Sequence, residues 1–198
     1  MNQLIIIAHP KNDSLNYTIK NELEKSFINQ RDQVKIRDLY KMNFNPVLNN
    51  GELKYVKEGN ICPEVFVEQN YIAWAENITI IYPLWWNSFP AILKGYIDRV
   101  FINKFAFKIT NQGPKGLLKR KKLRLITTAG MTEESLKKSH TYESLKVTQD
   151  IGVFEFCGLE VVDHLYITES SSLSENEKSK IVDRIIKKAN ENQKLMVN

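Results

Sequence analysis

The chain has 198 residues, which suits a single domain with a substantial buried core. Its hydrophobic content of 42% and charged content of 26% are those of an ordinary globular protein. The net charge of +5 is mild, and the dense basic run at residues 115–124 leads into an apolar segment, so a solvated loop is favoured there over a nucleic-acid partner. We therefore expect one domain over residues 1–198, whose surface attracts an anionic cofactor or substrate.

The two cysteines, Cys62 and Cys157, belong to no CxxC pair, which favours a reducing cytosol and argues against a structural disulfide or a zinc site. The apolar start, residues 4–8, is too short for a signal peptide and follows no basic segment. No apolar run approaches the roughly 20 residues of a membrane span. The sequence therefore predicts a cytoplasmic protein without membrane insertion and, because its three histidines are scattered, without a metal site.

Short apolar segments rich in β-branched residues recur along the chain. Their lack of alternation is typical of strands that are buried on both faces of a parallel sheet. We expect five such strands, at residues 4–8, 34–39, 77–83, 123–128 and 161–167.

Helices are predicted between these strands. Ser14 suits the N-cap of the first, Pro63 and Pro90 suit the first turns of two more, and Ser174 caps the last. The first helix carries apolar residues at a spacing of four: Leu15, Ile19, Leu23 and Phe27. Another, ended by Gly158 as its C′ residue, carries Leu145, Gln149, Val153 and Phe156.

Two further segments are predicted to be irregular. Residues 40–62 form a connection longer than most, which indicates a functional or interface element. The glycines and proline at 113–116 predict a loop before the fourth strand. The whole pattern predicts an α/β fold: a doubly wound five-stranded parallel sheet in the order 2-1-3-4-5, with helices on both faces.

In this fold the loops after strands one, three and four open at the same edge of the sheet, where ligands bind. The first loop offers His9, Ser14 and Asn16 at a helix N-terminus, which favours a phosphate. The loop after the fourth strand supplies the hydroxyls of Thr127 and Thr128. Each feature also has a structural interpretation, since Ser14 can be a simple N-cap and the threonines ordinary strand residues.

The loop after strand three contains Trp85 and Trp86 between Pro83 and Pro90. Taken alone, this stretch supports two interpretations equally. The tryptophans either close the end of the sheet or form a platform for a flat aromatic ligand. A phosphate pocket beside an aromatic wall suits a flavin or a nucleotide. Neither GxxxxGK[ST] nor GxGxxG follows the first strand, so the usual ATP and dinucleotide motifs are missing.

Several motifs occur in an order that resembles a known family. They are Ala8-His9-Pro10 with Ser14-Leu15-Asn16, Pro83-Leu84-Trp85-Trp86 with Pro90 to Gly95, Asp98-Arg99-Val100-Phe101, Phe105-Ala106-Phe107, Thr127-Thr128-Ala129-Gly130 and Phe156-Cys157-Gly158. On these motifs the chain resembles the flavodoxin-like NAD(P)H:quinone oxidoreductases of the DT-diaphorase and drug-activity-modulator type.

The resemblance implies a noncovalent flavin, FAD or alternatively FMN. Its phosphate and ribityl parts would be held by His9, Ser14, Leu15 and Asn16. Its ring would be flanked by Pro83, Leu84, Trp85, Trp86 and Asn87. The pyrimidine edge of the ring would face Thr127, Thr128, Ala129 and Gly130. The family also implies a homodimer with active sites at the interface, where the substrate meets Trp86 and Phe107.

The implied reaction is a two-electron, ping-pong transfer in which NADPH or NADH gives a hydride to flavin N5 and a quinone or similar electrophile then takes it. The backbone at Gly130 would stabilise negative charge on the reduced ring. The family commonly places a tyrosine and a histidine after this turn, but Ser135 and Thr141 occupy those positions here. The neighbouring His140 and Tyr142 are therefore the candidate catalytic residues.

Two other functions fit a flavin site. One is a flavin-binding regulatory subunit of a membrane transport system, as some relatives are, and the other is an electron carrier of flavodoxin type. Carriers tend to be acidic, so the pI near 9.0 argues against the second. Steady-state oxidation of NADPH with menadione distinguishes an enzyme from a regulatory subunit.

Overall fold

The computed structural model of the chain describes residues 1–194, with the side chains of residues 1–191. The strands are β1 (Asn2–Ile7), β2 (Gln33–Asp38), β3 (Asn77–Pro83), β4 (Phe107–Thr110), β5 (Gly113–Gly116), β6 (Lys122–Thr128) and β7 (Glu160–Ile167). The helices are α1 (Leu15–Asn29), α2 (Asn50–Lys57), α3 (Pro63–Trp74), α4 (Ala91–Val100), α5 (Glu133–Lys138), α6 (Thr141–Leu145), the π-helix η1 (Lys146–Glu155) and α7 (Glu175–Lys194). Within residues 1–194 no helix is both long and apolar enough to cross a bilayer.

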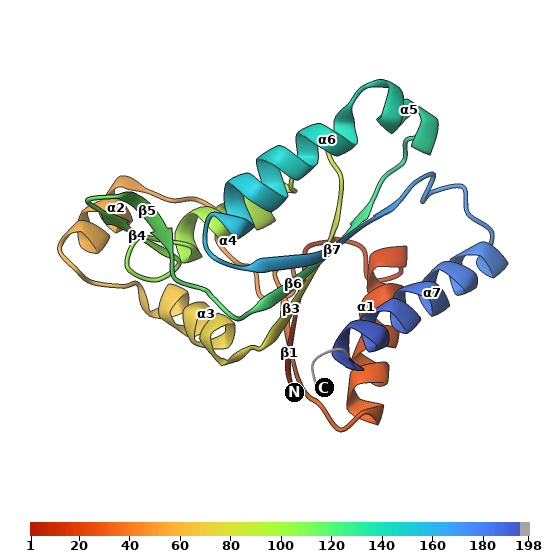
Figure 1. Cartoon of the computed structure of the whole chain (residues 1–198), viewed down its shortest axis with the longest axis horizontal. Helices are drawn as coiled ribbons and strands as arrows, with labels where there is room; N and C mark the ends of the chain where they lie inside the picture. The colour runs from red at the N-terminus through yellow and green to blue at the C-terminus, as the bar shows by residue number, and fades with distance from the viewer. Residues whose placement is uncertain (195–198) are drawn as a thin grey trace.

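Five strands form one parallel sheet in the order β2-β1-β3-β6-β7 (Figure 1). This is the predicted order 2-1-3-4-5, counted over the strands of that sheet, and the prediction is confirmed. Ile7, the last residue of β1, pairs with Ile81, which pairs with Ile126, and β3 and β6 continue two residues further to the paired Pro83 and Thr128. The sheet thus brings the carboxyl ends of β1, β3 and β6 to one edge.

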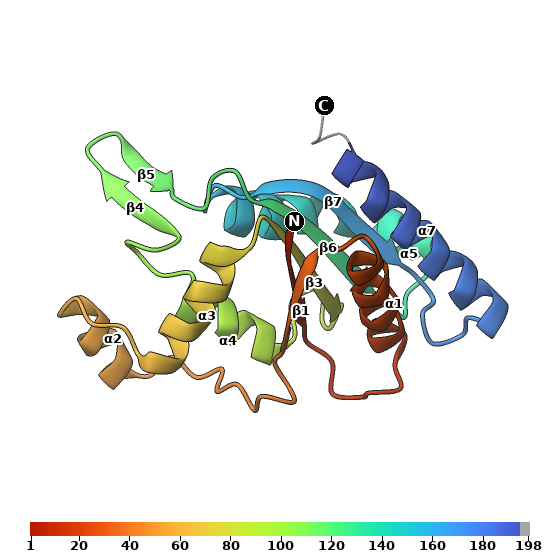
Figure 2. The ribbon, with the colours of Figure 1, turned by 90° about the horizontal axis from the view of Figure 1, so that it is seen from below.

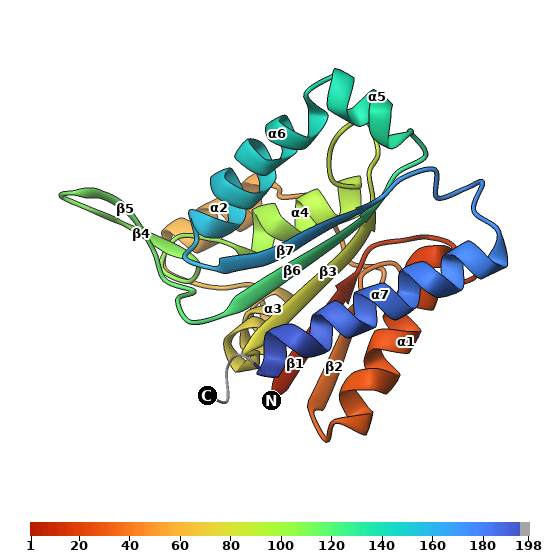
Figure 3. The same cartoon turned by 45° about the vertical axis from the view of Figure 1, so that its right-hand side comes forward.

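Alternate residues of each central strand enter two separate cores. Leu4 and Ile6 of β1 pack on the side of α3, α4 and η1, whereas Ile5 and Ile7 pack on the side of α1 and α7. All four side chains are fully buried, which explains why the strand is apolar without alternation. Helices therefore cover both faces of the sheet, as predicted (Figures 1 and 3).

The two segments predicted to be irregular contain regular structure. Helix α2 lies inside 40–62, where Asn49 accepts a hydrogen bond from the backbone N–H of Glu52 and caps it. Strands β4 and β5 form an antiparallel hairpin that extends away from the main sheet (Figures 2 and 3). These predictions were wrong because both elements are too short and too polar to give a periodic pattern.

The predicted helix around Leu145 is also different in detail. It is two short helices, α5 and α6, followed by η1, in which the N–H of Phe156 donates to the carbonyl of Ile151, five residues back. The wider turn buries Leu145, Gln149 and Phe154, whereas Phe156 remains 41% exposed. The α-helical spacing assumed for this segment therefore placed Phe156 on the wrong face. Gly158 has a φ of +91°, as its predicted C′ role requires.

A buried ion pair fixes α2 against the rest of the domain. Nε of Arg99 on α4 lies 2.9 Å from Oε2 of Glu52 on α2, and both side chains are at most 4% exposed. Arg99 also pairs with Glu64 on α3. Because Glu52 is buried, loss of Arg99 would leave a carboxylate without compensation, which is costly.

Arg99→Met should lower the free energy of unfolding by about 3–5 kcal/mol, measured by urea denaturation. The matched control is Lys94→Met on the same helix, because Lys94 pairs with Asp98 at the surface, where both side chains are at least 42% exposed. The control should lose only about 0.3–0.5 kcal/mol. Equal losses in the two variants would show that the Arg99 cluster does not hold α2.

Candidate functional site

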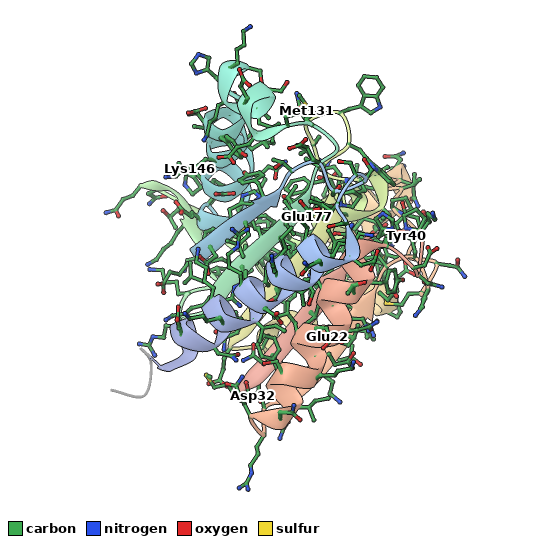
Figure 4. All side chains as sticks on the ribbon, turned by 90° about the vertical axis from the view of Figure 1, so that its right-hand side faces the viewer. Glu22, Asp32, Tyr40, Met131, Lys146 and Glu177 are labelled. Carbon is green, nitrogen blue, oxygen red and sulfur yellow. The ribbon has the colours of Figure 1, made fainter. Side chains whose placement is uncertain are left out.

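Hydrogen bonds at Thr128 join the three loops that the sequence placed at one sheet edge. Nδ2 of Asn16, on α1, lies 3.1 Å from Oγ1 of Thr128. The backbone N–H of Leu84, in the loop after β3, donates to the Thr128 carbonyl at 2.7 Å. Figure 4 shows Met131, just beyond the β6 turn, at the opposite end of the molecule from Asp32 before β2. The loops after β1, β3 and β6 therefore meet at one edge of the sheet, as predicted.

Ser14 lies at the start of α1 in an unusual state. It is the N-cap residue by its extended backbone, but its side chain makes no capping hydrogen bond. Its Oγ is buried and has no hydrogen-bond partner within residues 1–191. A buried hydroxyl without a partner is costly, so this atom indicates a ligand. The first-turn N–H groups of α1 add donors that favour an anion.

His9 is oriented beside the same helix end. Nδ1 of His9 lies 3.1 Å from the backbone nitrogen of Lys11 and 3.2 Å from its carbonyl oxygen, and these contacts orient the ring. Burial lowers the pKa of His9, so the ring is neutral near pH 7 and offers one N–H donor. Its ring centre lies 6.3 Å from that of Trp85. His9 thus connects the predicted phosphate loop to the predicted aromatic loop.

The tryptophans stand on a tight turn that begins after Leu84. Trp85 and Ser88 exchange two backbone hydrogen bonds, of 3.2 and 3.0 Å. Between them Trp86 and Asn87 both have a φ of +52°, as in a type I′ turn, which is strained for a tryptophan. Trp86 is 99% exposed and Trp85 41%. Backbone strain that displays a bare indole is typical of a binding platform and not of a plug.

The β6 turn presents backbone to the site, because its side chains are engaged elsewhere. Thr128 bonds to Asn16, and Oγ1 of Thr127 lies 3.0 Å from Nε2 of His164. Ala129 is buried and its φ is not positive, so this position does not require a glycine. Gly130 is exposed, and a Cβ added to it would meet no atom within 4 Å.

The remaining predicted residues lie outside this junction. His140 is exposed and starts α6 in the left-handed conformation, with a φ of +53°. Tyr142 packs edge-on against Tyr166 of β7, with ring centres 4.8 Å apart. Phe107, on the hairpin, packs 5.3 Å from Phe156. Ser135 is exposed, while Thr141 is buried with its hydroxyl bonded to Ser139.

Sequence reasoning missed a polar network directly beneath the site. Nδ1 of His164 lies 2.7 Å from Oδ1 of Asp150, and the Tyr82 hydroxyl donates to Oε1 of Gln149 at 2.6 Å. Burial raises the pKa of Tyr82 above its usual range. Tyr82 and Thr127 precede Pro83 and Thr128, so the network supports two of the three loops. The pairing of β3 with β6 and of β6 with β7 brings Tyr82, Thr127 and His164 together, and η1 adds Gln149 and Asp150.

Comparison with known proteins agrees with this geometry. A family model described as a flavodoxin-like fold matches residues 1–192. A protein of Haemophilus influenzae named as an uncharacterized NAD(P)H oxidoreductase is 42% identical, over 82% of this chain and 81% of that protein. The chain belongs to the flavodoxin-like family of NAD(P)H:quinone oxidoreductases. Its members are NAD(P)H-dependent flavoproteins.

More distant relatives fit the same family. The rat NAD(P)H dehydrogenase (quinone) 1 is 28% identical over 81% of this chain, and the alignment spans 66% of the rat protein. The crystal structure of Smu.1420 from Streptococcus mutans superposes with a TM-score of 0.82 at 27% identity, covering 94% of this chain and 97% of that one. The alignments thus cover nearly all of the Streptococcus mutans chain but only two thirds of the rat enzyme.

The site fits the flavin that this family uses. A bound flavin would meet the Ser14 hydroxyl and the α1 N-terminus with its phosphate, and Trp86 with its flat ring. Within residues 1–191 the Ser14 hydroxyl is buried without a partner and the Trp86 indole is uncovered.

Trp86→Gly should raise the free energy of unfolding of the flavin-free protein by about 0.5–1 kcal/mol. Relief of the left-handed strain gives roughly 1–2 kcal/mol, and the flexibility of glycine in the unfolded chain removes about half of it. No packing is lost, since the side chain is 99% exposed. Trp86→Ala is the control, because it keeps the strain. Equal stability of the two variants in urea denaturation would contradict a strained turn.

Proposed function

We propose that the chain is a flavin-dependent NAD(P)H dehydrogenase that reduces quinones or similar electrophiles by two-electron transfer, and that it works in the cytoplasm. The observation that carries this is that the buried Ser14 hydroxyl, without a partner within residues 1–191, and the exposed indole of Trp86 lie on loops that meet at one sheet edge. A ligand with both a phosphate and a flat ring would satisfy both.

The proposed contacts follow the loops. Ser14, His9 and the first-turn N–H groups of Leu15 and Asn16 hold the phosphate and ribityl parts. Pro83, Leu84, Trp85, Trp86 and Asn87 flank the ring, and Thr127, Thr128, Ala129 and Gly130 line its pyrimidine edge. FAD is the proposed cofactor and FMN the alternative. When bound, the flavin supplies the hydride-accepting and hydride-donating chemistry.

The protein's own residues orient the cofactor and stabilise the charge that develops on it. The β6 turn is held at Thr128 and at Ala129, whose N–H donates to the carbonyl of Ile167, so the N–H of Gly130 is the donor proposed for the edge where negative charge would develop. Its side-chain hydroxyls are engaged inside the protein, so the contribution of Thr127 to binding is through its backbone. The platform of Trp86 excludes water from one side of the ring. NADPH or NADH and the acceptor use the same open face in turn, with Trp86 and Phe107 as their contacts.

Tyr142 is the better of the two candidate catalytic residues. Its ring is half-buried and packs on Tyr166, whose hydroxyl lies 3.0 Å from Nδ1 of His164. It is therefore joined to the polar network that supports the β6 turn, whereas His140 is exposed. We assign Tyr142 the role of stabilising the negative charge on the reduced cofactor, and we assign His140 a secondary role.

An apolar surface supports a homodimer with active sites at the interface. A groove of about 340 Å³ runs between α2, α4 and η1 and is lined by apolar side chains that include Leu53, Phe101 and Val153. Exposed residues extend it, with Phe66 at 52% and Ile151 at 46%. Contiguous apolar surface of this kind marks protein interfaces. Sedimentation velocity tests the proposal, since a species at the 23.0 kDa mass of one chain would oppose it.

Purified protein should carry one flavin per chain and oxidise NADPH with menadione, with parallel double-reciprocal plots. Ser14→Ala should weaken flavin binding about 10- to 100-fold, the value of a hydrogen bond to a charged group. It should make the flavin-free protein slightly more stable, because Ser14 makes no capping bond and its buried hydroxyl has no partner within residues 1–191. Thr18→Ala, an exposed hydroxyl one turn along α1, is the control and should bind flavin normally.

Chromatography of the released cofactor distinguishes FAD from FMN. Tight flavin binding without NAD(P)H oxidation would contradict the proposed enzymatic function and favour the alternative function as a regulatory subunit of a membrane transport system. A Ser14→Ala variant that binds flavin as well as Thr18→Ala would contradict the phosphate site.

A further inference from the structure

An ionisable pair lies beneath the candidate site. Nδ1 of His164, on β7, is 2.7 Å from Oδ1 of Asp150, on η1, and the two side chains are only 6% and 8% exposed. On the other side of the ring, Nε2 of His164 lies 3.0 Å from Oγ1 of Thr127. Thr127 directly precedes Thr128, the residue that joins the three loops, so these contacts connect η1 to the candidate site.

A hydroxyl, a histidine and a carboxylate in this order are also the parts of a hydrolytic triad. In a triad the hydroxyl must reach a substrate, whereas Thr127 is fully buried. The group therefore does not attack a substrate. It keeps the other property of a triad, which is that the ring can hold an extra proton while the carboxylate compensates the charge.

Both protonation states of His164 find partners in the same geometry. A carboxylate only accepts hydrogen bonds, so Asp150 keeps a proton on Nδ1 in either state. Nε2 accepts from the Thr127 hydroxyl when the ring is neutral and donates to the same oxygen when the ring is charged. In the second state the Thr127 hydroxyl can donate to Tyr82, with which it also forms a hydrogen bond. No buried group loses its partner when the proton binds, so binding requires little reorganisation.

The nearest aromatic neighbours of His164 are neutral. The hydroxyls of Tyr82 and Tyr166 lie 3.5 and 3.0 Å from its ring nitrogens. Burial raises the pKa of both tyrosines above their usual range, and it also raises the pKa of Tyr142 on α6. Asp150 is therefore the charged group in direct contact with the ring.

Other charged groups face His164 across two cavities that its side chain lines. The first, of about 410 Å³, includes Glu133, Arg184 and Lys188, of which Lys188 pairs with Asp163. The second, of about 520 Å³, includes Asp150 itself with Glu143, Lys146 and Glu155. The side chains of both signs, apart from Asp150 and Asp163, are exposed, so water reaches these cavities and can supply a proton to the pair.

We propose that His164 binds a proton when negative charge appears at the β6 turn, with Asp150 as the counter-charge. This inference rests on the proposed function, because that charge is the one a hydride brings. One hydride passes from NAD(P)H to the cofactor, NAD(P)⁺ leaves, and the site gains one negative charge. One proton from water then binds Nε2 of His164. When a quinone takes the hydride and one proton from water to become a hydroquinone, the charge disappears and His164 returns its proton to water.

The coupling is electrostatic. A positive ring in contact with Thr127 favours negative charge at the turn, and charges in a buried site attract each other far more strongly than in water. Such a coupling is reciprocal, so proton binding favours reduction as much as reduction favours proton binding. His164 touches neither cofactor nor substrate in this proposal, and it is therefore a positioning residue with a role separate from that of Tyr142.

The test is a spectroelectrochemical titration of the flavin-loaded protein at a series of pH values, with mediators in place of NAD(P)H. In a two-electron couple each coupled proton changes the midpoint potential by about 30 mV per tenfold change in proton concentration. Because the hydride brings one proton and His164 a second, the potential should fall by about 60 mV per pH unit over part of the neutral range. His164→Gln still offers Thr127 a partner but cannot hold a charge, so its slope should be about 30 mV per pH unit.

The matched control is Tyr166→Phe, which removes a hydroxyl 3.0 Å from Nδ1 of His164 and leaves the ionisable pair intact. It should keep the slope of the parent protein. If His164 were merely structural, His164→Gln would also keep that slope, and this result would overturn the proposal. A parent slope of about 30 mV per pH unit at every pH would overturn it as well.

A second measurement needs no variant. Nitrogen NMR of the three histidine rings should show the tautomer with a proton on Nδ1 for His164 in the flavin-free protein. Reduction of bound flavin at constant pH should then add a proton to Nε2 of the same ring. Unchanged ring signals on reduction would overturn the proposal, even if His164→Gln does not fold. Failure to oxidise NAD(P)H would contradict the proposed enzyme alone, because the mediators still reduce the flavin, whereas failure to bind flavin would contradict both.

Discussion

Hydrogen bonds to Thr128 hold the candidate site together. Its hydroxyl contacts Asn16 of α1 and its carbonyl accepts the N–H of Leu84, so the loops after three different strands meet at one residue. Each bond contributes only about 0.5–1.5 kcal/mol to stability. Their main effect is geometric, because they set the distance between the helix N-terminus at Ser14 and the platform at Trp86. The Tyr82 and His164 network supports the same strand ends from below.

The site keeps features that cost stability, and this is what identifies it. Ser14 buries a hydroxyl without a partner in the described structure, and Trp86 has a left-handed backbone with its ring in solvent. Elsewhere the fold satisfies such groups, as at the buried Arg99 and Glu52 pair. Local violations that lie together at a sheet edge are typical of a functional site. Family membership then identifies the ligand class as a flavin.

Much of this was predictable from sequence. Unalternating apolar strands such as Leu4 to Ile7 specify a parallel sheet, and proline and serine signals located the long helices. Helix α2 was not predictable, because a tertiary ion pair and a local cap stabilise it instead of an apolar stripe. The assumed α-helical spacing failed in η1, where the turn is wider. The role of Thr127 beside His164 depends on the pairing of β6 with β7, which no local pattern contains.

Hydrogen–deuterium exchange with and without added flavin tests most directly whether the three loops form one flavin site. Protection is predicted at residues 9–16, 83–90 and 127–131 together, with the same dependence on flavin concentration. The exposed edge of β7, which does not belong to this site, should exchange at an unchanged rate. Protection of only one loop, or protection at another part of the surface, would contradict the account.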